Sequence, residues 1–289
     1  MKRIVHVGAA AVALHLLFAE APALASDGVI EINQAKVMKA GGFPYVISKA
    51  GSYRLTSNLD ITAQPTPQNL TVVKIIVGDV TLDLSGFAII GANVCTASGN
   101  PGLGTPTSVS CTKNGTGVGV SDPADGTTYI SNVTVKNGTV RGMGAEGIRL
   151  TQVSGVEISD VHASSNGGMG FYLDLGIVAR CTIEKNLNAG ISVTTGSVLS
   201  SSTTFNGKEG IGLGAGVAAD NEVYSNGTDG ISMSGGVARN NSVQFNGNGM
   251  RFNGTAGYVG NVLYGNVSGT VTSGIQIGQN LCNGSTTCP

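Results

Sequence analysis

The stretch that decides the fold is SNGTDGISMSGGVARNNSVQFNGNGM, residues 225–250. Its abundance of Gly, Asn and Ser is typical of loops and disordered segments. Single apolar residues nevertheless return through it, among them Ile231, Val237 and Met250. The stretch is therefore either a linker or part of a fold that needs Asn and Gly at fixed places, and its period separates the two.

A repeat of 20 residues runs through the second half of the chain. Six asparagines share this step: Asn166, Asn186, Asn206, Asn226, Asn246 and Asn266. Four residues after most of them, a glycine precedes an apolar residue, as in Gly190-Ile191 and Gly230-Ile231. A second polar column occupies Asn221, Asn241 and Asn261. A strand-like segment precedes each member of the first column, so every repeat combines short strands with polar corners.

The length of the repeat predicts an all-β fold, a single parallel β-helix. Helical solenoids need about 33–47 residues per unit, and leucine-rich repeats need a leucine pattern that this chain lacks. A coil of about 20 residues can form three short strands, each paired with the next coil about 4.8 Å away. Asparagines at the same corner of each coil can then stack and satisfy buried polar groups. We interpret the first column as such a structural ladder; a ligand-binding row of Asn is the alternative.

Weaker copies of the repeat extend toward the N-terminus. They occupy residues 43–61, 80–91, 133–150 and 156–173. The sequence thus predicts about nine coils in one domain. Residues 30–40 are expected to form a short helix, with Ile32, Ala35 and Met38 on one face. This helix would cap the open end of the solenoid, which otherwise exposes unpaired backbone.

Residues 1–25 have the features of a secretory signal peptide. Lys2 and Arg3 precede an apolar run over residues 4–18, and Ala23-Leu24-Ala25 fits cleavage after small residues. A transmembrane anchor is the alternative, but the run is shorter than the roughly 20 residues that a span needs. We expect a mature domain of residues 26–289, secreted or periplasmic, without membrane insertion after cleavage.

The cysteines agree with export. Cys95 and Cys111 flank one Gly/Pro/Thr-rich stretch, Cys282 and Cys288 flank another, and Cys181 is left over. Two local disulfides are expected in an oxidising compartment. The second would close a C-terminal loop over residues 281–289.

Residues 92–128 interrupt the repeat. This stretch is rich in Gly, Pro, Ser and Thr, and the coil pattern returns at about Tyr129. We expect an inserted loop that projects from one coil and is stapled by the first cysteine pair. It is either a decorated surface loop or a wall or lid over a binding groove; the second alternative is considered because long insertions in compact domains are often functional.

Composition excludes several classes of partner and site. The formal net charge is -1, so no strong field favours nucleic acid or an anionic membrane. His162 is the single histidine beyond the signal peptide, which argues against a His/Cys zinc site. Trp is absent and aromatic residues make up 5% of the chain. Stacking of sugar rings on aromatic side chains is therefore expected to be weak.

The repeat resembles a known family. GIxM and GIxV strands alternate with Asn-containing turns, and GSYRLTSNLDI is followed by VTLDLSGFAIIG. Over residues 43–280 the chain is similar to right-handed parallel β-helix repeat proteins of the pectate-lyase-like superfamily, in particular to exported bacterial members without an assigned activity. The resemblance implies a right-handed coil. The superfamily includes polysaccharide lyases, hydrolases, epimerases, adhesins and phage tailspikes, so it selects no single function.

Aligning VTLD, VTVKN and VEISD by their first Val places five charged residues on neighbouring coils: Asp83, Lys136, Glu157, Asp160 and Arg180. A uronate lyase or epimerase needs a cation for the substrate carboxylate, a base and an acid. The resemblance implies calcium as a candidate cofactor, held by Asp83, Glu157 and Asp160, with Arg180 or Lys136 as the base. The alternative is a solvated sheet face with opposite charges paired across strands.

A second candidate is SDPADG at residues 121–126. Uronate epimerases of this fold are similar in carrying an acidic DPH-like motif, but Ala124 stands where its histidine would be. Asp-Pro-x-Asp-Gly is also common turn chemistry. We therefore favour a turn here.

The leading functional hypothesis is a secreted β-helix protein that contacts a polysaccharide or cell-surface glycan, with polyuronate lyase or epimerase-like activity as its enzymatic form. The alternative is a non-enzymatic surface, adhesion or matrix protein. Whether the chain is an enzyme stays open on the sequence alone.

Overall fold

The computed structural model describes residues 28–288. The signal peptide predicted over residues 1–25 lies outside the described residues. Between residues 28 and 288, no helix is both long and apolar enough to cross a membrane.

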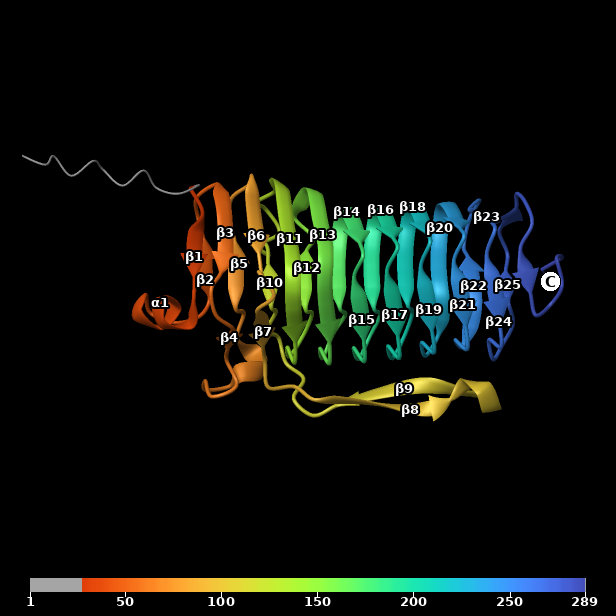
Figure 1. Cartoon of the computed structure of the whole chain (residues 1–289), viewed down its shortest axis with the longest axis horizontal. Coiled ribbons are helices and arrows are strands. Elements are labelled where there is room, and N and C mark those ends of the chain that lie inside the picture. Colours follow the sequence, from red (N-terminus) through yellow and green to blue (C-terminus); the bar gives the residue numbers. More distant parts are fainter. Residues whose placement is uncertain (1–27, 289) are drawn as a thin grey trace, which may run out of the picture.

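The chain winds into a parallel β-helix, seen side-on as a straight rod in Figure 1. Three parallel sheets run along the rod. The first sheet contains β1 (Ile30–Ile32), β3 (Gly51–Leu55), β6 (Val80–Asp83), β11 (Ile130–Arg141), β13 (Val153–Ser164), β14 (Phe171–Ala179), β16 (Ile191–Leu199), β18 (Ile211–Ala219), β20 (Asp229–Arg239), β23 (Gly257–Val259) and β26 (Ile275–Gln276). Several of these strands are long enough to turn a corner and join a second sheet.

The second sheet contains β2 (Tyr45–Ile47), β5 (Val73–Ile75), β10 (Val120–Ser121), β12 (Ile148–Leu150), the first residues of β14, β16, β18 and β20, then β22 (Asn248–Phe252) and β25 (Val271–Thr272). The third sheet contains β4 (Leu59–Asp60), β7 (Ala88–Ile90), the last residues of β11 and β13, then β15 (Thr182–Glu184), β17 (Ser202–Thr204), β19 (Glu222–Tyr224), β21 (Ser242–Gln244), β24 (Val262–Tyr264) and β27 (Leu281–Cys282). The first sheet thus has eleven strands and the third has ten, so residues 28–288 form more coils than the nine expected.

The 20-residue period is the register of the sheets. Ile191 pairs with Ile211, which pairs with Ile231, and Ile231 pairs with Met250 in the coil that is one residue short. All four side chains are fully buried. Each coil therefore places its apolar residues directly over those of the coil before, and the core is one continuous column.

Two asparagine ladders line the corners of the solenoid. In the first, each Asn Nδ2 from Asn166 to Asn246 donates to Oδ1 of the next ladder asparagine at 2.8–3.1 Å. The backbone N–H of the same residue donates to the same oxygen. The second ladder continues through Asn221, Asn241 and Asn261 to Asn280. Polar corners are thereby satisfied inside the fold, as buried polar groups require.

Cys181 occupies the position of the second ladder in an earlier coil. Its backbone N–H donates to Ser201 Oγ at 3.2 Å, as ladder asparagines donate to one another. The thiol is free and buried, and burial raises its pKa to about 11. It is a small buried side chain in the wall of the coil.

The N-terminal helix differs in detail from the expectation. α1 (Gln34–Lys39) begins after Asn33, whose side chain accepts the Lys36 N–H at 2.9 Å. Ile32 belongs to strand β1, and the buried helix residue is Val37, whereas Met38 is 43% exposed. The predicted face is wrong because the helix is only six residues long and the preceding strand takes Ile32.

The interruption at residues 92–128 is not one structureless loop. β8 (Cys95–Asn100) and β9 (Thr105–Cys111) form an antiparallel hairpin, with a single 3₁₀ turn, η2 (Pro101–Leu103), at its tip. A second 3₁₀ turn, η1 (Pro67–Asn69), precedes β5. The coil register returns at β10, where Val118 and Val120 are fully buried, and not at Tyr129 as predicted.

Candidate functional site

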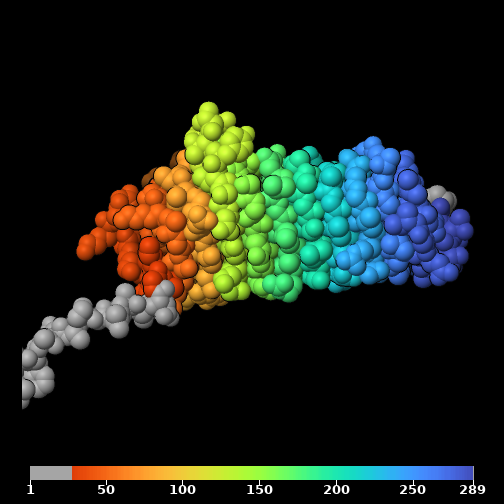
Figure 2. Space-filling model, turned by 90° about the horizontal axis from the view of Figure 1, so that it is seen from above, coloured from red at the N-terminus to blue at the C-terminus, as the bar shows by residue number. Residues whose placement is uncertain are grey.

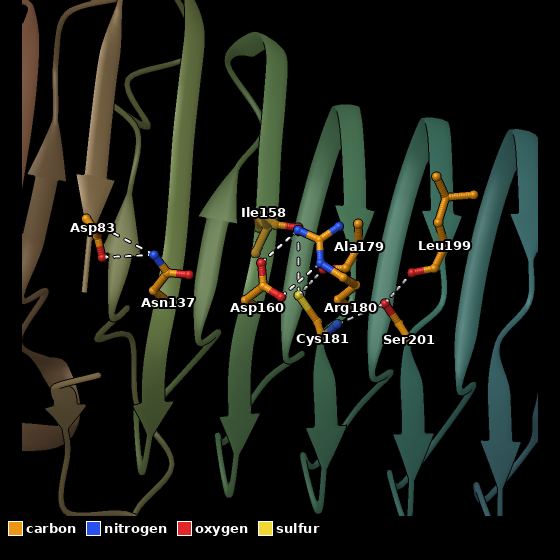
Figure 3. A network of polar contacts seen from close by, with 9 residues as sticks. All are labelled: Asp83, Asn137, Ile158, Asp160, Ala179, Arg180, Cys181, Leu199 and Ser201. Atoms are coloured by element: carbon orange, nitrogen blue, oxygen red, sulfur yellow. Dashed lines mark hydrogen bonds and ion pairs between the residues drawn. The ribbon is translucent and has the colours of Figure 1, made fainter. Parts of the chain in front are cut away.

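The predicted charged patch centres on one ion pair between adjacent coils. Asp160 and Arg180 both occupy corners with positive φ, at 57° and 54°. Arg180 Nε and Nη2 donate to the two carboxylate oxygens of Asp160 at 2.9 and 2.7 Å, and both side chains are exposed (Figure 3). The hydrogen bond from Arg180 lowers the pKa of Asp160, and the same bond raises the pKa of Arg180. The two charges neutralise each other.

Asp83 lies toward the N-terminal end of the same face. Its Oδ1 accepts the Ser85 N–H at 2.7 Å, and Asn137 Nδ2 donates to both oxygens at 3.3 Å (Figure 3). Lys136 is the register partner of Asp83 on the next coil. The two residues line a shallow groove of about 270 Å³ together with Arg54. Asp83 is thus held mainly by its own turn and the neighbouring asparagine.

The three candidate metal ligands, Asp83, Glu157 and Asp160, do not form one group of carboxylates. Glu157 pairs in register with Thr134 on one side and Ile177 on the other. Within residues 28–288, no three His, Cys, Asp or Glu side chains are grouped so as to hold a metal ion. The structure therefore does not assemble Asp83, Glu157 and Asp160 into the calcium site that the resemblance implied.

The SDPADG segment forms a projecting turn, visible as the yellow-green knob on the rod in Figure 2. Asp122 is fully buried and accepts the backbone N–H groups of Thr151 and Gln152. Asp125 accepts the N–H groups of Thr127 and Thr128, and bonds from Thr128 hold its pKa well below the ordinary range. Asp125 caps its own turn, as the sequence interpretation favoured, whereas Asp122 binds the backbone of the next coil.

The β8–β9 hairpin lies along the outside of the solenoid, below the third sheet in Figure 1. The Cys95–Cys111 disulfide closes its base. Two corner glycines allow β9 to approach. A Cβ added to Gly207 would lie 3.3 Å from Val109 Cβ, and a Cβ added to Gly227 would lie 2.6 Å from the Thr107 carbonyl oxygen. The insertion therefore lies against the coils and does not project freely from one of them.

A groove of about 410 Å³ opens between β8 and the third sheet. Residues 95–99 form one side, and Lys185 and Phe205 form the other. These two residues directly follow β15 and β17, at a corner that we call the third corner. At the far end, an added Cβ on Gly102 at the hairpin tip would lie 3.8 Å from Phe245 Cε1. The hairpin thus follows the third corner across several coils.

Four aromatic side chains form a row beside this groove: Phe205, Tyr224, Phe245 and Tyr264. We call this row the aromatic stripe. Successive ring centroids are 5.9, 5.4 and 5.6 Å apart, and each pair meets edge to face. None of the four rings is a core residue: Phe205 is 36% and Tyr264 is 55% exposed, and Tyr224 and Phe245 are half-buried. The stripe crosses four coils on the surface of the rod.

The two phenylalanines of the stripe sit at strained backbone positions. Phe205 and Phe245 occupy the third corner with φ of 54° and 56°. Bulky side chains rarely adopt this left-handed region, and strain of this kind concentrates at functional sites. Other coils place Ser225 and Gly265 at the equivalent corner. The phenylalanines are therefore not needed to build the corner, and their rings, exposed at Phe205 and half-buried at Phe245, are available for another role.

Comparison with known proteins identifies the fold. The family model described as "Right handed beta helix region" matches residues 85–219. The chain is a right-handed parallel β-helix. No curated protein sequence matches it.

Several solved β-helix structures are similar in shape. The Dettilon tailspike protein (gp208) is 16% identical with a TM-score of 0.47, and 88% of this chain covers 55% of that one. The periplasmic alginate epimerase AlgG is 16% identical with a TM-score of 0.44, and 81% of this chain covers 57% of it. The A-module of the mannuronan C-5 epimerase AlgE4 of Azotobacter vinelandii is 14% identical with a TM-score of 0.39, over 85% of this chain and 83% of that module. The β-helix described here spans just over half the length of the first two.

The aromatic stripe of this β-helix was missed at the sequence level. Its residues are separated by 19, 21 and 19 positions, not by 20. They alternate between the end of a third-sheet strand and the corner that follows it, so no single column of the repeat contains them. The expectation of weak aromatic stacking rested on residue counts, which do not reveal that four rings gather on one surface.

Proposed function

We propose that this β-helix is an exported protein that binds an extended polysaccharide along the outside of its rod. The observation that carries the proposal is the partly exposed aromatic stripe beside the hairpin groove. Elongated ligands suit a surface whose recognition elements repeat from coil to coil, because each coil can meet the next unit of the ligand. The wall formed by β8 gives this surface a concave side, as ligand sites usually have.

The chemistry of the stripe suits sugar rings. Pyranose rings present apolar C–H faces to aromatic side chains and hydroxyl groups to their surroundings. The outer face next to the stripe offers hydroxyl and amide groups from Ser202, Thr204, Ser242 and Gln244 on paired strands. A tyrosine combines an apolar ring with a polar end, which is useful at such an interface. Stripe and strand face together therefore provide both kinds of contact.

Aromatic rows also stack on nucleic-acid bases, but the charge here argues against that ligand. Single-stranded nucleic acid needs a positively charged groove along its backbone. The groove and the stripe contain Lys185 as their cation, and its Nζ lies 3.7 Å from Glu184 Oε2. We therefore propose a glycan and not a nucleic acid.

Export is part of the proposal. The sequence features of residues 1–25 and the two disulfides, Cys95–Cys111 and Cys282–Cys288, support an oxidising compartment. The glycan would then belong to a cell surface, an extracellular matrix or the periplasm.

For the charged face we propose a structural role. A base such as Arg180 needs access to the substrate proton, and carboxylates that hold calcium need free oxygens. Both Asp160 oxygens already accept bonds from Arg180, and Asp83 is occupied by Ser85 and Asn137. Binding without turnover, as in an adhesion or matrix protein, is therefore the activity that we propose.

The test is glycan binding by the mature chain, measured on an immobilised polysaccharide panel and by calorimetry for positive members. Phe245→Ala and Tyr264→Ala are each expected to weaken binding about tenfold, roughly 1.4 kcal/mol. Tyr129→Ala is the matched control, because Tyr129 is 74% exposed and lies outside the stripe. The proposal fails if no glycan binds, or if the stripe variants bind as well as the control.

A further inference from the structure

We infer that the polysaccharide held by the groove and the stripe has an uncharged backbone and is not a polyuronate. This inference rests on the proposed function and adds the chemical class of the ligand. It comes from the charges along the path from the hairpin base to Tyr264.

The hairpin wall contributes no charge to the groove. Thr96, Ala97, Ser98 and Gly99 supply hydroxyl groups, backbone and a methyl group. Ser98 Oγ and Ser108 Oγ are 2.8 Å apart across the two strands, so the outer wall is a hydroxyl surface. Such a wall can exchange hydrogen bonds with sugar hydroxyls in place of water.

The cation in the groove is already engaged. Lys185 Nζ lies 3.7 Å from Glu184 Oε2, and the other oxygen of Glu184 lies 3.3 Å from His162 Nε2. The anion thus sits between two basic groups. Lys185 would have to leave this cluster to meet a substrate carboxylate.

Further along the path, the nearest strand-face charge is negative. Glu222 precedes Tyr224 by two residues on β19, so both side chains point to the same outer face. Its register partners on either side are Ser202 and Ser242. An acid next to the stripe repels a carboxylate-bearing ligand at the point where the rings would stack.

The charge on the ligand then distinguishes between the two classes of polysaccharide, polyuronates and neutral glycans. A polyuronate carries one carboxylate on every ring, and placing unpaired charges against an apolar stripe incurs their desolvation. A neutral glycan incurs only the exchange of hydroxyl hydrogen bonds with water, which is nearly balanced. The surface therefore favours neutral chains over polyuronates.

The geometry also sets the direction in which the polysaccharide chain would lie. The groove and the stripe lie at the ends of β15, β17, β19, β21 and β24, which follow one another along the rod axis in Figure 1, from the coil of Lys185 to the coil of Tyr264. These residues lie on five successive coils, so the path is roughly 19 Å long at about 4.8 Å per coil. Long chains should therefore bind more tightly than disaccharides of the same sugar, because they contact more rings.

The experiment compares neutral polysaccharides (β-glucans, α-glucans, mannans and xylans) with alginate and polygalacturonate, at low and high salt. The expected result is retention on at least one neutral glycan, insensitive to salt and lost in Phe205→Ala/Phe245→Ala. Glu222→Lys should create polyuronate retention that salt removes. Circular dichroism and thermal unfolding check that each variant keeps its fold.

The outcomes separate the two proposals. Polyuronate binding by the wild type that depends on Phe205 and Phe245 would overturn the inference of an uncharged ligand and leave the proposed function standing. The absence of binding to every glycan in both classes would overturn both. Neutral-glycan binding that is lost in the stripe variants supports both.

Discussion

Arg251 Nε lies 2.9 Å from a carboxylate oxygen of Asp229, and this ion pair joins the two coils at which the repeat is one residue short. The Asp229 side chain is only 7% exposed, and Asn248 Nδ2 also donates to it, at 2.8 Å. The register passes from Asp229 to Asn248, a step of 19 residues. The pair therefore satisfies a buried acid at the place where the coil geometry changes.

Removing the cation from this pair should destabilise the fold. Arg251→Met leaves the buried Asp229 carboxylate with one hydrogen-bond donor fewer, and unpaired buried charges are costly. We expect a loss of roughly 2 kcal/mol in the free energy of unfolding, since hydrogen bonds to charged groups contribute about 1.5–3 kcal/mol. Urea denaturation measures it. Arg239→Met is the control, because Arg239 is exposed at the far end of β20, the strand that begins with Asp229, and should change little. Equal effects of the two substitutions would contradict the assignment.

Substitutions in the first asparagine ladder should destabilise the fold more than substitutions of exposed asparagines. Asn226 is fully buried, donates to Asn246 and Thr203, and accepts from Asn206. Asn226→Ala leaves several of these groups unpaired, each at about 1–3 kcal/mol, so partial unfolding at 37 °C is expected. Thermal unfolding by circular dichroism checks this. Asn253→Ala, at an exposed position, should melt with the wild type.

The ladder was predictable because its signal is local and repeated. Every coil recreates the same corner, so Asn166 and its five successors needed only the step of 20 to be placed together. The core column of Ile191, Ile211 and Ile231 follows from the same step. The disulfide pairs were predictable from short separations within irregular segments.

The binding surface was not predictable, for physical reasons. Phe205 lies at the third corner, and Tyr224 ends a strand on the next coil. A column-by-column alignment therefore places the two residues in different columns. The hairpin closely approaches Gly207 and Gly227, which lie 112 and 132 residues after Cys95 at its base. The alignment placed Asp160 next to Arg180, but whether these side chains bind each other or a ligand depends on side-chain geometry.

Gly216 belongs to a stack of glycines in the first sheet and should not tolerate a side chain. It has a φ of 138°, and an added Cβ would overlap the carbonyl oxygen of Gly196 in the preceding coil. Gly216→Ala is expected to lower the free energy of unfolding by several kcal/mol, in the range of the larger single-residue effects. Gly212→Ala is the matched control on the same strand, where the nearest atom to an added Cβ is 3.8 Å away. Urea midpoints that shift equally in both variants would rule out close coil packing as the cause.

The Asp160–Arg180 pair should contribute to stability in a pH-dependent way. The pKa of Asp160 is lowered by the hydrogen bond from Arg180. A carboxyl group with a lowered pKa in the folded state contributes stability above its ordinary pKa of about 3.9, and this is lost as the pH falls through the lowered value. Asp160→Asn should therefore melt slightly below the wild type at neutral pH, and the difference should vanish in acid. Asp174→Asn, which removes an acid that accepts a 3.4 Å bond from the Thr194 hydroxyl, is the control.

The same variant separates the two interpretations of the charged face. If Asp160 only stabilises the corner, Asp160→Asn keeps glycan retention unchanged, and the melting difference fades in acid. If the face performs uronate chemistry, the wild type releases unsaturated products from a polyuronate or epimerises its uronate residues. Asp160→Asn then loses this turnover, while its melting temperature stays within the range of the Asp174→Asn control. The second pattern would contradict a purely structural role, because turnover would then be lost without a loss of stability.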